Sequence, residues 1–174
     1  TLETYVGGSV SLVYPASGRY RSAIITKDLD GDGKPEVFSF YKTSTDDKTA
    51  VLHINYIRWT DAGGWVSVSD IEVKSSGVES VEFATLDHSG LPKIIVSWSR
   101  FSAVDKQVSV YEMNAGILAE VTSESYSVFS TCDFDGDGVS DIVAVHLDKE
   151  AGTSTASLLS LTEQGFTKNS SCML

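Results

Sequence analysis

The sequence is short of basic residues and has no long apolar run. Its 13 Lys and Arg residues stand against 24 Asp and Glu residues, which gives a formal net charge of −11 and a pI near 4.5. Nucleic-acid phosphates would repel such a chain, so a nucleic-acid partner is excluded. No apolar stretch reaches the roughly 20 residues of a membrane-spanning helix, so we expect no membrane span in this chain.

Cysteine is too scarce for a disulfide framework or a zinc site. The two cysteines, Cys132 and Cys172, have no second Cys or His at ligand spacing. A disulfide between them is one alternative. We expect two buried thiols instead, because free cysteine behaves as a small apolar residue. Cysteine therefore does not fix the compartment of the protein.

Signatures of common catalytic sites are missing as well. The sequence contains no Gly-x-Ser-x-Gly elbow, no Gly-x-Gly-x-x-Gly turn and no Walker pattern. His53, His88 and His146 lie far apart, and none has a second His, Cys or acid at ligand spacing. We interpret them as strand or surface residues and expect no enzyme activity.

Two segments of nine residues are unusually acidic. Their carboxylates stand at positions 1, 3, 5 and 9: Asp28, Asp30, Asp32 and Glu36 in the first segment, and Asp133, Asp135, Asp137 and Asp141 in the second. Four like charges so close repel one another unless a cation lies among them. Glycines at positions 4 and 6 let the backbone wrap around an ion. We predict one Ca²⁺ ion in each segment, because this ion prefers shells of oxygen ligands.

Two other interpretations of these segments were weighed. An EF-hand needs a Glu at position 12 and flanking helices, but Ser39 and Ala144 stand there and apolar strand patterns follow. A solvated Asp-Gly turn explains one such segment as well as a metal does. The same pattern occurring twice between strands favours the metal.

Alternating and apolar runs predict an all-β chain, since no segment shows sustained helical periodicity. The polar residues 44–48 are expected to be a connection. The predicted strands are Val10–Tyr14, Arg21–Thr26, Val37–Lys42, Val51–Trp59, Trp65–Ile71, Val78–Thr85, Ile94–Trp98, Gln107–Met113, Ile117–Val121, Val128–Cys132, Asp141–Leu147, Thr155–Leu161 and Phe166–Cys172. Four short strands in each period of about 50 residues are typical of propeller blades.

A third loop, between the two acidic ones, has lost the pattern. Aligned on Pro35 and Pro92, it keeps Asp87 and Gly90 but places Lys93 where position 9 should be. We predict no Ca²⁺ in this loop. One hypothesis is that the Lys93 ammonium replaces the ion and pairs with Asp87. The alternative is an exposed lysine that contributes almost nothing.

The motif Asp-x-Asp-Gly-Asp-Gly-x-x-Asp/Glu between two strands resembles the FG-GAP/VCBS repeats of integrin α-subunit propellers and of bacterial surface and secreted proteins. The resemblance implies antiparallel β-propeller blades with Ca²⁺ between the first two strands of a blade. It adds the carbonyl oxygens of Lys34 and Val139 to the ligands of the two sites. The run from Leu12 through Arg21 to Asp28 also resembles lipoproteins of Gram-positive bacteria, which implies a lipid anchor in the full-length precursor.

The expected blades cover residues 21–76, 77–125 and 126–174, and residues 1–20 are the end of a preceding blade. Three blades cannot close a ring, and closed propellers usually have four to eight. The chain begins at Thr1 rather than Met. We therefore expect either a mature product or excised piece that continues into further blades, or an open arc that self-associates. Both imply an exposed apolar face at one or both ends.

The function that follows is a calcium-stabilised interaction or scaffold module without catalysis, whose ligand is an unidentified protein or glycan. Loops of modest affinity fill where Ca²⁺ is abundant, so we expect an extracellular or cell-surface location. The alternative is a carbohydrate-binding module or the non-catalytic part of a polysaccharide-active enzyme. Trp59, Trp65 and Trp98 could stack on sugars, but we expect them to pack between blades.

Overall fold

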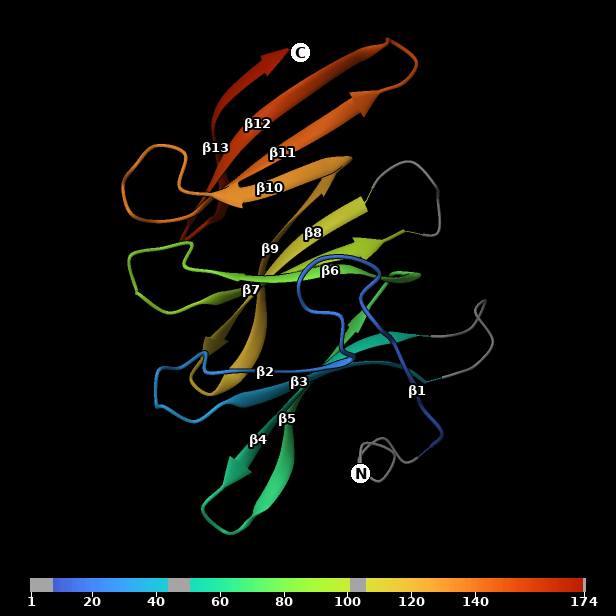
Figure 1. Ribbon diagram of the computed structural model, residues 1–174, viewed down its shortest axis with the longest axis vertical. Helices are drawn as coiled ribbons and strands as arrows, with labels where there is room; N and C mark the ends of the chain where they lie inside the picture. Colours follow the sequence, from blue (N-terminus) through green and yellow to red (C-terminus); the bar gives the residue numbers. More distant parts are fainter. Residues whose placement is uncertain (1–7, 44–50, 101–105, 174) are drawn as a thin grey trace.

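The chain folds into three antiparallel β-sheets, as a computed structural model shows (Figure 1). The structure describes residues 8–43, 51–100 and 106–173, and within these ranges it contains strands and no helix. The predicted all-β class is therefore confirmed. The predicted connection at residues 44–48 lies outside the described residues.

The first sheet has five strands because two short strands share one partner. Strands β1 and β2 both pair with β3, which then pairs with β4 and β4 with β5. The bounds are β1 Ser11–Leu12, β2 Ile24–Lys27, β3 Glu36–Lys42, β4 Leu52–Thr60 and β5 Gly64–Val73. The predicted strand at Val10–Tyr14 is thus reduced to two residues.

The second and third sheets are four-stranded meanders in chain order. The second contains β6 Gly77–Ala84, β7 Lys93–Ser99, β8 Lys106–Asn114 and β9 Ile117–Tyr126. The third contains β10 Val128–Cys132, β11 Asp141–Asp148, β12 Thr153–Thr162 and β13 Gly165–Met173. Strands β6 and β10 begin these sheets and lead into two of the three loops singled out in the sequence, and β2 of the first sheet leads into the other.

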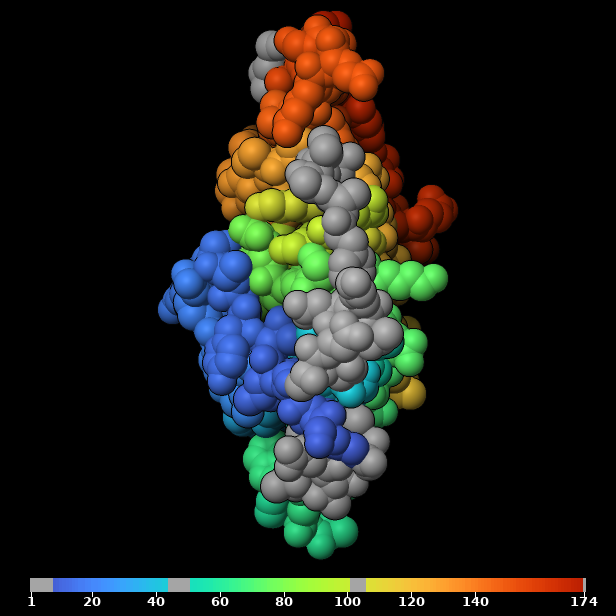
Figure 2. Space-filling model, turned by 90° about the vertical axis from the view of Figure 1, so that its right-hand side faces the viewer, coloured from blue at the N-terminus to red at the C-terminus, as the bar shows by residue number. Residues whose placement is uncertain are grey.

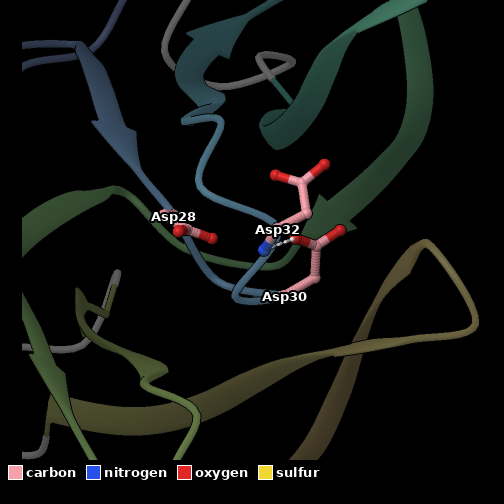
Figure 3. A group of neighbouring side chains, drawn as sticks. All are labelled: Asp28, Asp30 and Asp32. Carbon is pink, nitrogen blue, oxygen red and sulfur yellow. Dashed lines mark hydrogen bonds between the residues drawn. The ribbon is translucent and has the colours of Figure 1, made fainter.

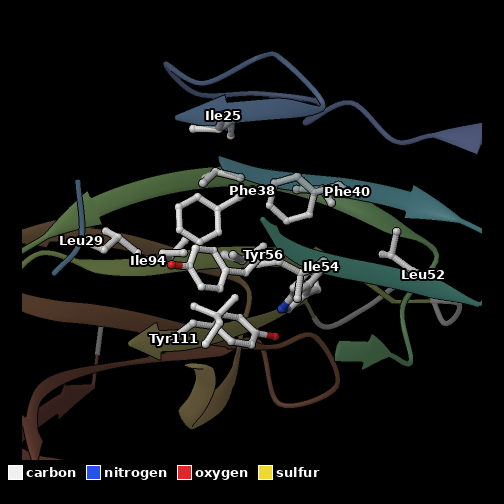
Figure 4. Packing of buried hydrophobic residues seen from close by; sticks show 14 residues of the cluster. Ile25, Leu29, Phe38, Phe40, Leu52, Ile54, Tyr56, Ile94 and Tyr111 are labelled. Carbon is white, nitrogen blue, oxygen red and sulfur yellow. The ribbon is translucent and has the colours of Figure 1, made fainter. Parts of the chain in front are cut away.

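The sheets are stacked face to face along the long axis of the molecule, and Figure 2 shows the same stack from the side. Between the first and second sheets lies a cluster of 14 buried residues that includes Phe38, Tyr56 and Trp98 (Figure 4). A smaller cluster between the second and third sheets contains eight, among them Ile95 and Ile142. Strand β7 is buried along almost its whole length because its sheet is covered on both faces.

The third sheet leaves its outer face uncovered. Strand β13 is exposed along most of its length, and Val128, Leu147 and Met173 are among the exposed large apolar residues. Exposed apolar side chains are therefore present at this end, beside the mostly polar residues of β13. The three sheets do not close into a ring, so the propeller stays a prediction from the sequence.

The expectation of buried thiols is wrong. Cys132 ends β10 and Cys172 lies near the end of β13, and both are free and exposed. The two strands are the outer strands of the third sheet, so they lie on opposite sides of it. An edge position on an uncovered sheet explains their exposure, because no neighbouring layer packs against them.

Candidate metal-binding loops

Three loops lie in a row along one side of the stack, and each joins the first two strands of the meander in its sheet (Figure 1). The β2–β3 loop meets the β6–β7 loop, since a Cβ atom on Gly31 would lie 3.2 Å from the Leu91 side chain. The β6–β7 loop meets the β10–β11 loop through a hydrogen bond from the Ser140 amide to the Thr85 carbonyl, at 2.8 Å. The row brings the two predicted calcium sites and the degenerate loop to one surface.

The first loop is organised by the carboxylate of Asp28. Its two oxygens accept hydrogen bonds from the backbone amides of Gly31 at 2.8 Å and Gly33 at 3.0 Å. Both glycines have positive φ, 77° and 82°, a conformation that suits glycine. The Asp32 amide bonds to Asp30 at 3.1 Å, and the Lys34 amide to Asp32 at 2.7 Å. The backbone therefore curls around its own carboxylates.

The β10–β11 loop repeats this network bond for bond. Asp133 accepts from the amides of Gly136 at 2.7 Å and Gly138 at 3.0 Å. The Asp137 amide bonds to Asp135 at 3.2 Å, and the Val139 amide to Asp137 at 2.8 Å. Two loops more than a hundred residues apart thus share one conformation, which the spacing of the sequence motif predicts.

Three carboxylates come together in each loop. In the first they belong to Asp28, Asp30 and Asp32, which Figure 3 shows on the β2–β3 loop. In the second they belong to Asp133, Asp135 and Asp141. One oxygen from each member lies within 4.8 Å of the others. Oxygens on opposite sides of a Ca²⁺ ion are about 5 Å apart, so both groups fit this ion.

Glu36 and Asp137 were predicted as ligands but lie outside these two groups. Glu36 is buried at the start of β3 and accepts a hydrogen bond from the Leu29 amide at 2.7 Å. Burial raises the pKa of Glu36, and the nearby carboxylates of Asp30, Asp28 and Asp32 raise it further. Negative charge is therefore concentrated around the first loop, where a cation would be stabilised.

The degenerate β6–β7 loop holds a protein cation at position 9. The Lys93 ammonium lies 2.9 Å from an Asp87 oxygen and 2.7 Å from a Glu112 oxygen, and its side chain is 7% exposed. Burial acts to lower the pKa of Lys93, but the hydrogen bonds to Glu112 and Asp87 outweigh it and raise this pKa. The predicted pair with Asp87 is confirmed, and the exposed-lysine alternative is wrong.

Glu112 was missed in the sequence, although the strand register points to it. Since Ile94 faces Tyr111 across β7 and β8, Lys93 faces Glu112. In the third sheet the same register places Asp141 opposite Ser160, whose hydroxyl donates to the Asp141 carboxylate. In the first sheet Glu36 faces Arg58. Two of the three position-9 residues therefore face a side chain of opposite charge, and Asp141 faces a neutral serine.

The three histidines lie in three different sheets or their loops. His53 is buried on β4 and stacks on Tyr41, with ring centroids 4.7 Å apart. His88 and His146 each approach one carboxylate, of Asp137 at 3.9 Å and of Glu124 at 3.8 Å. The structure does not bring the three together.

The expectation that all three tryptophans are packed between sheets is wrong for two of them. Trp98 is buried at 1% exposure between the first two sheets. Trp59 and Trp65 are 51% and 46% exposed. They face each other across the end of the β4–β5 hairpin, with ring centroids 5.6 Å apart and planes at 76°. The hairpin extends past the neighbouring sheet, so its tip has no layer to pack against.

The part of the chain that the structure describes contains no helix that could cross a bilayer. No protein-family model matches the chain. No curated protein matches it either.

Proposed function

We propose that this protein is a calcium-stabilised β-sheet module of FG-GAP/VCBS type that serves as an interaction or scaffold unit and has no catalysis of its own. The observation that carries the proposal is the shared hydrogen-bond network of the two acidic loops, each with three clustered carboxylates. An ordinary exposed turn does not require three carboxylates within reach of one ion. The loop between them, with its buried lysine, supports the same need for positive charge.

Calcium supplies charge neutralisation and a link between strands when it is bound. The first ion would be held by Asp28, Asp30 and Asp32, and the second by Asp133, Asp135 and Asp141. Glu36, the Lys34 carbonyl, Asp137 and the Val139 carbonyl are the further ligands that the repeat motif implies. Each loop joins two neighbouring strands, so the binding free energy becomes folding free energy.

The proposed location is extracellular or at the cell surface, with a lipid anchor in the precursor. Calcium-binding modules outside cells work with dissociation constants of about 10⁻⁴–10⁻³ M, which only a calcium-rich compartment saturates. A net charge of −11 agrees with such a setting, because high free Ca²⁺ offsets it locally.

The proposed partner of the uncovered end is a further blade or a second copy of the chain. Leu29 in the first loop and Leu86 in the second are buried at 1% and 2% exposure, each against the following sheet. Phe134 occupies the same position in the third loop and is 48% exposed. This ring is the contact that a following sheet would cover.

Thermal unfolding in millimolar Ca²⁺ and in excess EGTA tests the proposal. At a free concentration about ten times the dissociation constant, each site adds about 1.4 kcal/mol, so chelation should lower the Tm by about 6 °C or more. Isothermal titration should give two equivalents of Ca²⁺ per chain. An unchanged melting curve in EGTA would refute the stabilising role.

A further inference from the structure

A hollow lies beside the first acidic loop and has walls of two different kinds. It has a volume of about 230 Å³. One wall is the loop itself, with Asp30, Asp32 and Glu36, and the other is the end of the β4–β5 hairpin, with Tyr56, Arg58 and Trp59. Sites for drug-sized ligands measure roughly 300–1,000 Å³, so this hollow suits a single ring.

Trp59 gives the hollow an exposed aromatic wall. Half of its surface is accessible, which is costly for an apolar ring in water. The edge-to-face contact with Trp65 restrains the orientation of the indole. A restrained aromatic face attracts the weakly positive C–H groups of a sugar ring, because the face of an aromatic ring is electron-rich.

Tyr56 is the second observation that points to a ligand. Its side chain is 1% exposed and lines the hollow. No hydrogen bond joins its hydroxyl to another described residue, and this oxygen is not one of the fully enclosed polar atoms, so the hollow leaves it accessible. Burial raises the pKa of Tyr56 to about 12, and the charge of Glu36 adds to the effect. The phenol is therefore a proton donor at neutral pH, and a ligand in the hollow can accept its hydrogen bond.

Arg58 is the third group that remains available. It faces Glu36 across β3 and β4, yet the two form no ion pair, in contrast to Lys93 and Glu112 in the second sheet. Its guanidinium instead reaches the β8–β9 turn, 3.3 Å from where a Cβ atom on Gly116 would be. The part of the chain that is described offers Arg58 no carboxylate within 4.0 Å. Several of its donors can therefore bind oxygens in the hollow.

The charge around the hollow decides between neutral and acidic ligands. Asp30, Asp32, Glu36 and Asp61 line it, against the cations of Lys34 and Arg58. A chain with a net charge of −11 also repels polyanions at long range. A ligand with hydroxyl groups meets both signs, since a hydroxyl donates to carboxylates and accepts from Tyr56 and Arg58.

We propose that this hollow binds one residue of a neutral glycan, with the sugar ring against Trp59 and its hydroxyls on Tyr56, Arg58 and the acidic loop. The inference rests on the proposed function, because Asp30 and Asp32 belong both to the calcium loop and to the wall of the hollow. Calcium fixes that wall, so glycan binding should depend on calcium. The third sheet offers no equivalent, since Leu161 and Ser160 occupy the positions of Trp59 and Arg58.

Saturation-transfer NMR on methyl glycosides of glucose, galactose and mannose tests the inference with the whole chain in millimolar Ca²⁺. At least one glycoside should bind saturably. Trp59→Ala should weaken binding by about tenfold, the equivalent of about 1.4 kcal/mol. Tyr56→Phe and Arg58→Gln should each weaken it several-fold. Phe134→Ala removes a ring of similar exposure from the other acidic loop and should leave binding unchanged.

The outcomes separate the inference from the proposed function. If Ca²⁺ raises the Tm but no glycoside binds, or Trp59→Ala binds as well as the parent, the glycan site is refuted and the calcium module stands. If a glycoside binds equally in EGTA, with no effect of Ca²⁺ on the Tm, the calcium role fails and the hollow remains the site. Tighter binding of polygalacturonate than of the neutral glycosides would overturn the assignment to a neutral sugar. Circular dichroism of each variant shows that it folds.

Discussion

Lys93 of the second sheet and Glu36 of the first occupy one position of the repeat and carry opposite charge. In the first sheet the loop gathers carboxylates and has no buried cation of its own. In the second sheet the carboxylates of Asp87 and Glu112 form ion pairs with the ammonium of Lys93. Under the proposed function, the joint between the first two strands of a sheet needs positive charge, which either an ion or a side chain can supply. The first joint should then depend on calcium and the second should not.

The largest effect is expected from removing the first carboxylate of both acidic loops. Asp28→Ala with Asp133→Ala removes a ligand from each ion and the partner of two glycine amides in each loop. We expect a loss of about 5 kcal/mol in the free energy of unfolding at saturating Ca²⁺, measured by chemical denaturation. The melting curve of this variant should no longer respond to EGTA.

Asp148→Ala is the matched control for that variant. Asp148 also accepts two backbone amides, from Glu150 and Ala151, but in an exposed turn outside the acidic loops. The Asp148→Ala substitution should lower the free energy of unfolding by about 1 kcal/mol or less. The loss should be the same with and without Ca²⁺. A calcium-dependent loss in the control would contradict the assignment of the sites.

The second prediction compares the covered and uncovered loops. Leu29→Ala should cost about 2–4 kcal/mol, because the side chain is buried between two sheets. Phe134→Ala should stay within about 0.5 kcal/mol in the isolated chain. Both are measured by urea denaturation. A loss for Phe134→Ala that grows with protein concentration would show that a second copy covers this ring.

The third prediction concerns the buried ammonium of Lys93. Lys93→Met leaves Asp87 and Glu112 close together without a counter-charge, and we expect a loss of about 2–3 kcal/mol, below the range for fully buried pairs because both acids are partly exposed. The loss should be the same in Ca²⁺ and in EGTA. Lys106→Met, which breaks the exposed pair with Glu79, should cost about 0.5 kcal/mol or less.

The pH dependence of the same pair follows from its pKa. The raised pKa of Lys93 in the folded protein means that its contribution is complete below the ordinary value of 10.5. The contribution is lost as the pH rises through the folded-state pKa. The difference in the free energy of unfolding between the parent and Lys93→Met should therefore become smaller at strongly alkaline pH. A constant difference would contradict the ion pair.

The smallest net effect on stability is expected from restoring a third acidic loop. Thr85→Asp, His88→Gly, Ser89→Asp and Lys93→Glu together recreate the spacing of the first loop. The gain of an ion and the loss of the lysine pair are each worth about 2–3 kcal/mol, so they nearly offset each other. The readout is stoichiometry: isothermal titration should rise from two to three equivalents of Ca²⁺. A count that stays at two would show that Glu112 blocks the site.

The sequence predicts the loops better than the surfaces around them. Loop conformation follows from local chemistry, namely carboxylates that accept nearby amides and glycines with positive φ, as at Gly31 and Gly136. The pairing of Lys93 with Asp87 was predictable for the same reason, because both residues belong to one loop. Glu112 needed the strand register, which the sequence does not show directly.

Exposure was harder to predict because it depends on what lies beyond each strand. Trp59 and Trp65 are large apolar residues in strands, which are usually buried, but their hairpin extends past the second sheet. Cys132 and Cys172 were expected to be buried because cysteine is small and apolar, but they lie on edge strands of an uncovered sheet. In both cases the strand was predicted correctly, but no neighbouring sheet packs against the side chains.

The unequal apolar clusters between the sheets have a mechanical consequence. The first interface contains 14 buried residues and the second contains eight. If the chain is pulled from both ends, the third sheet should detach first while the first two stay together. The molecule should then unfold in steps, and the hollow beside the first acidic loop should stay intact at forces that already detach the third sheet.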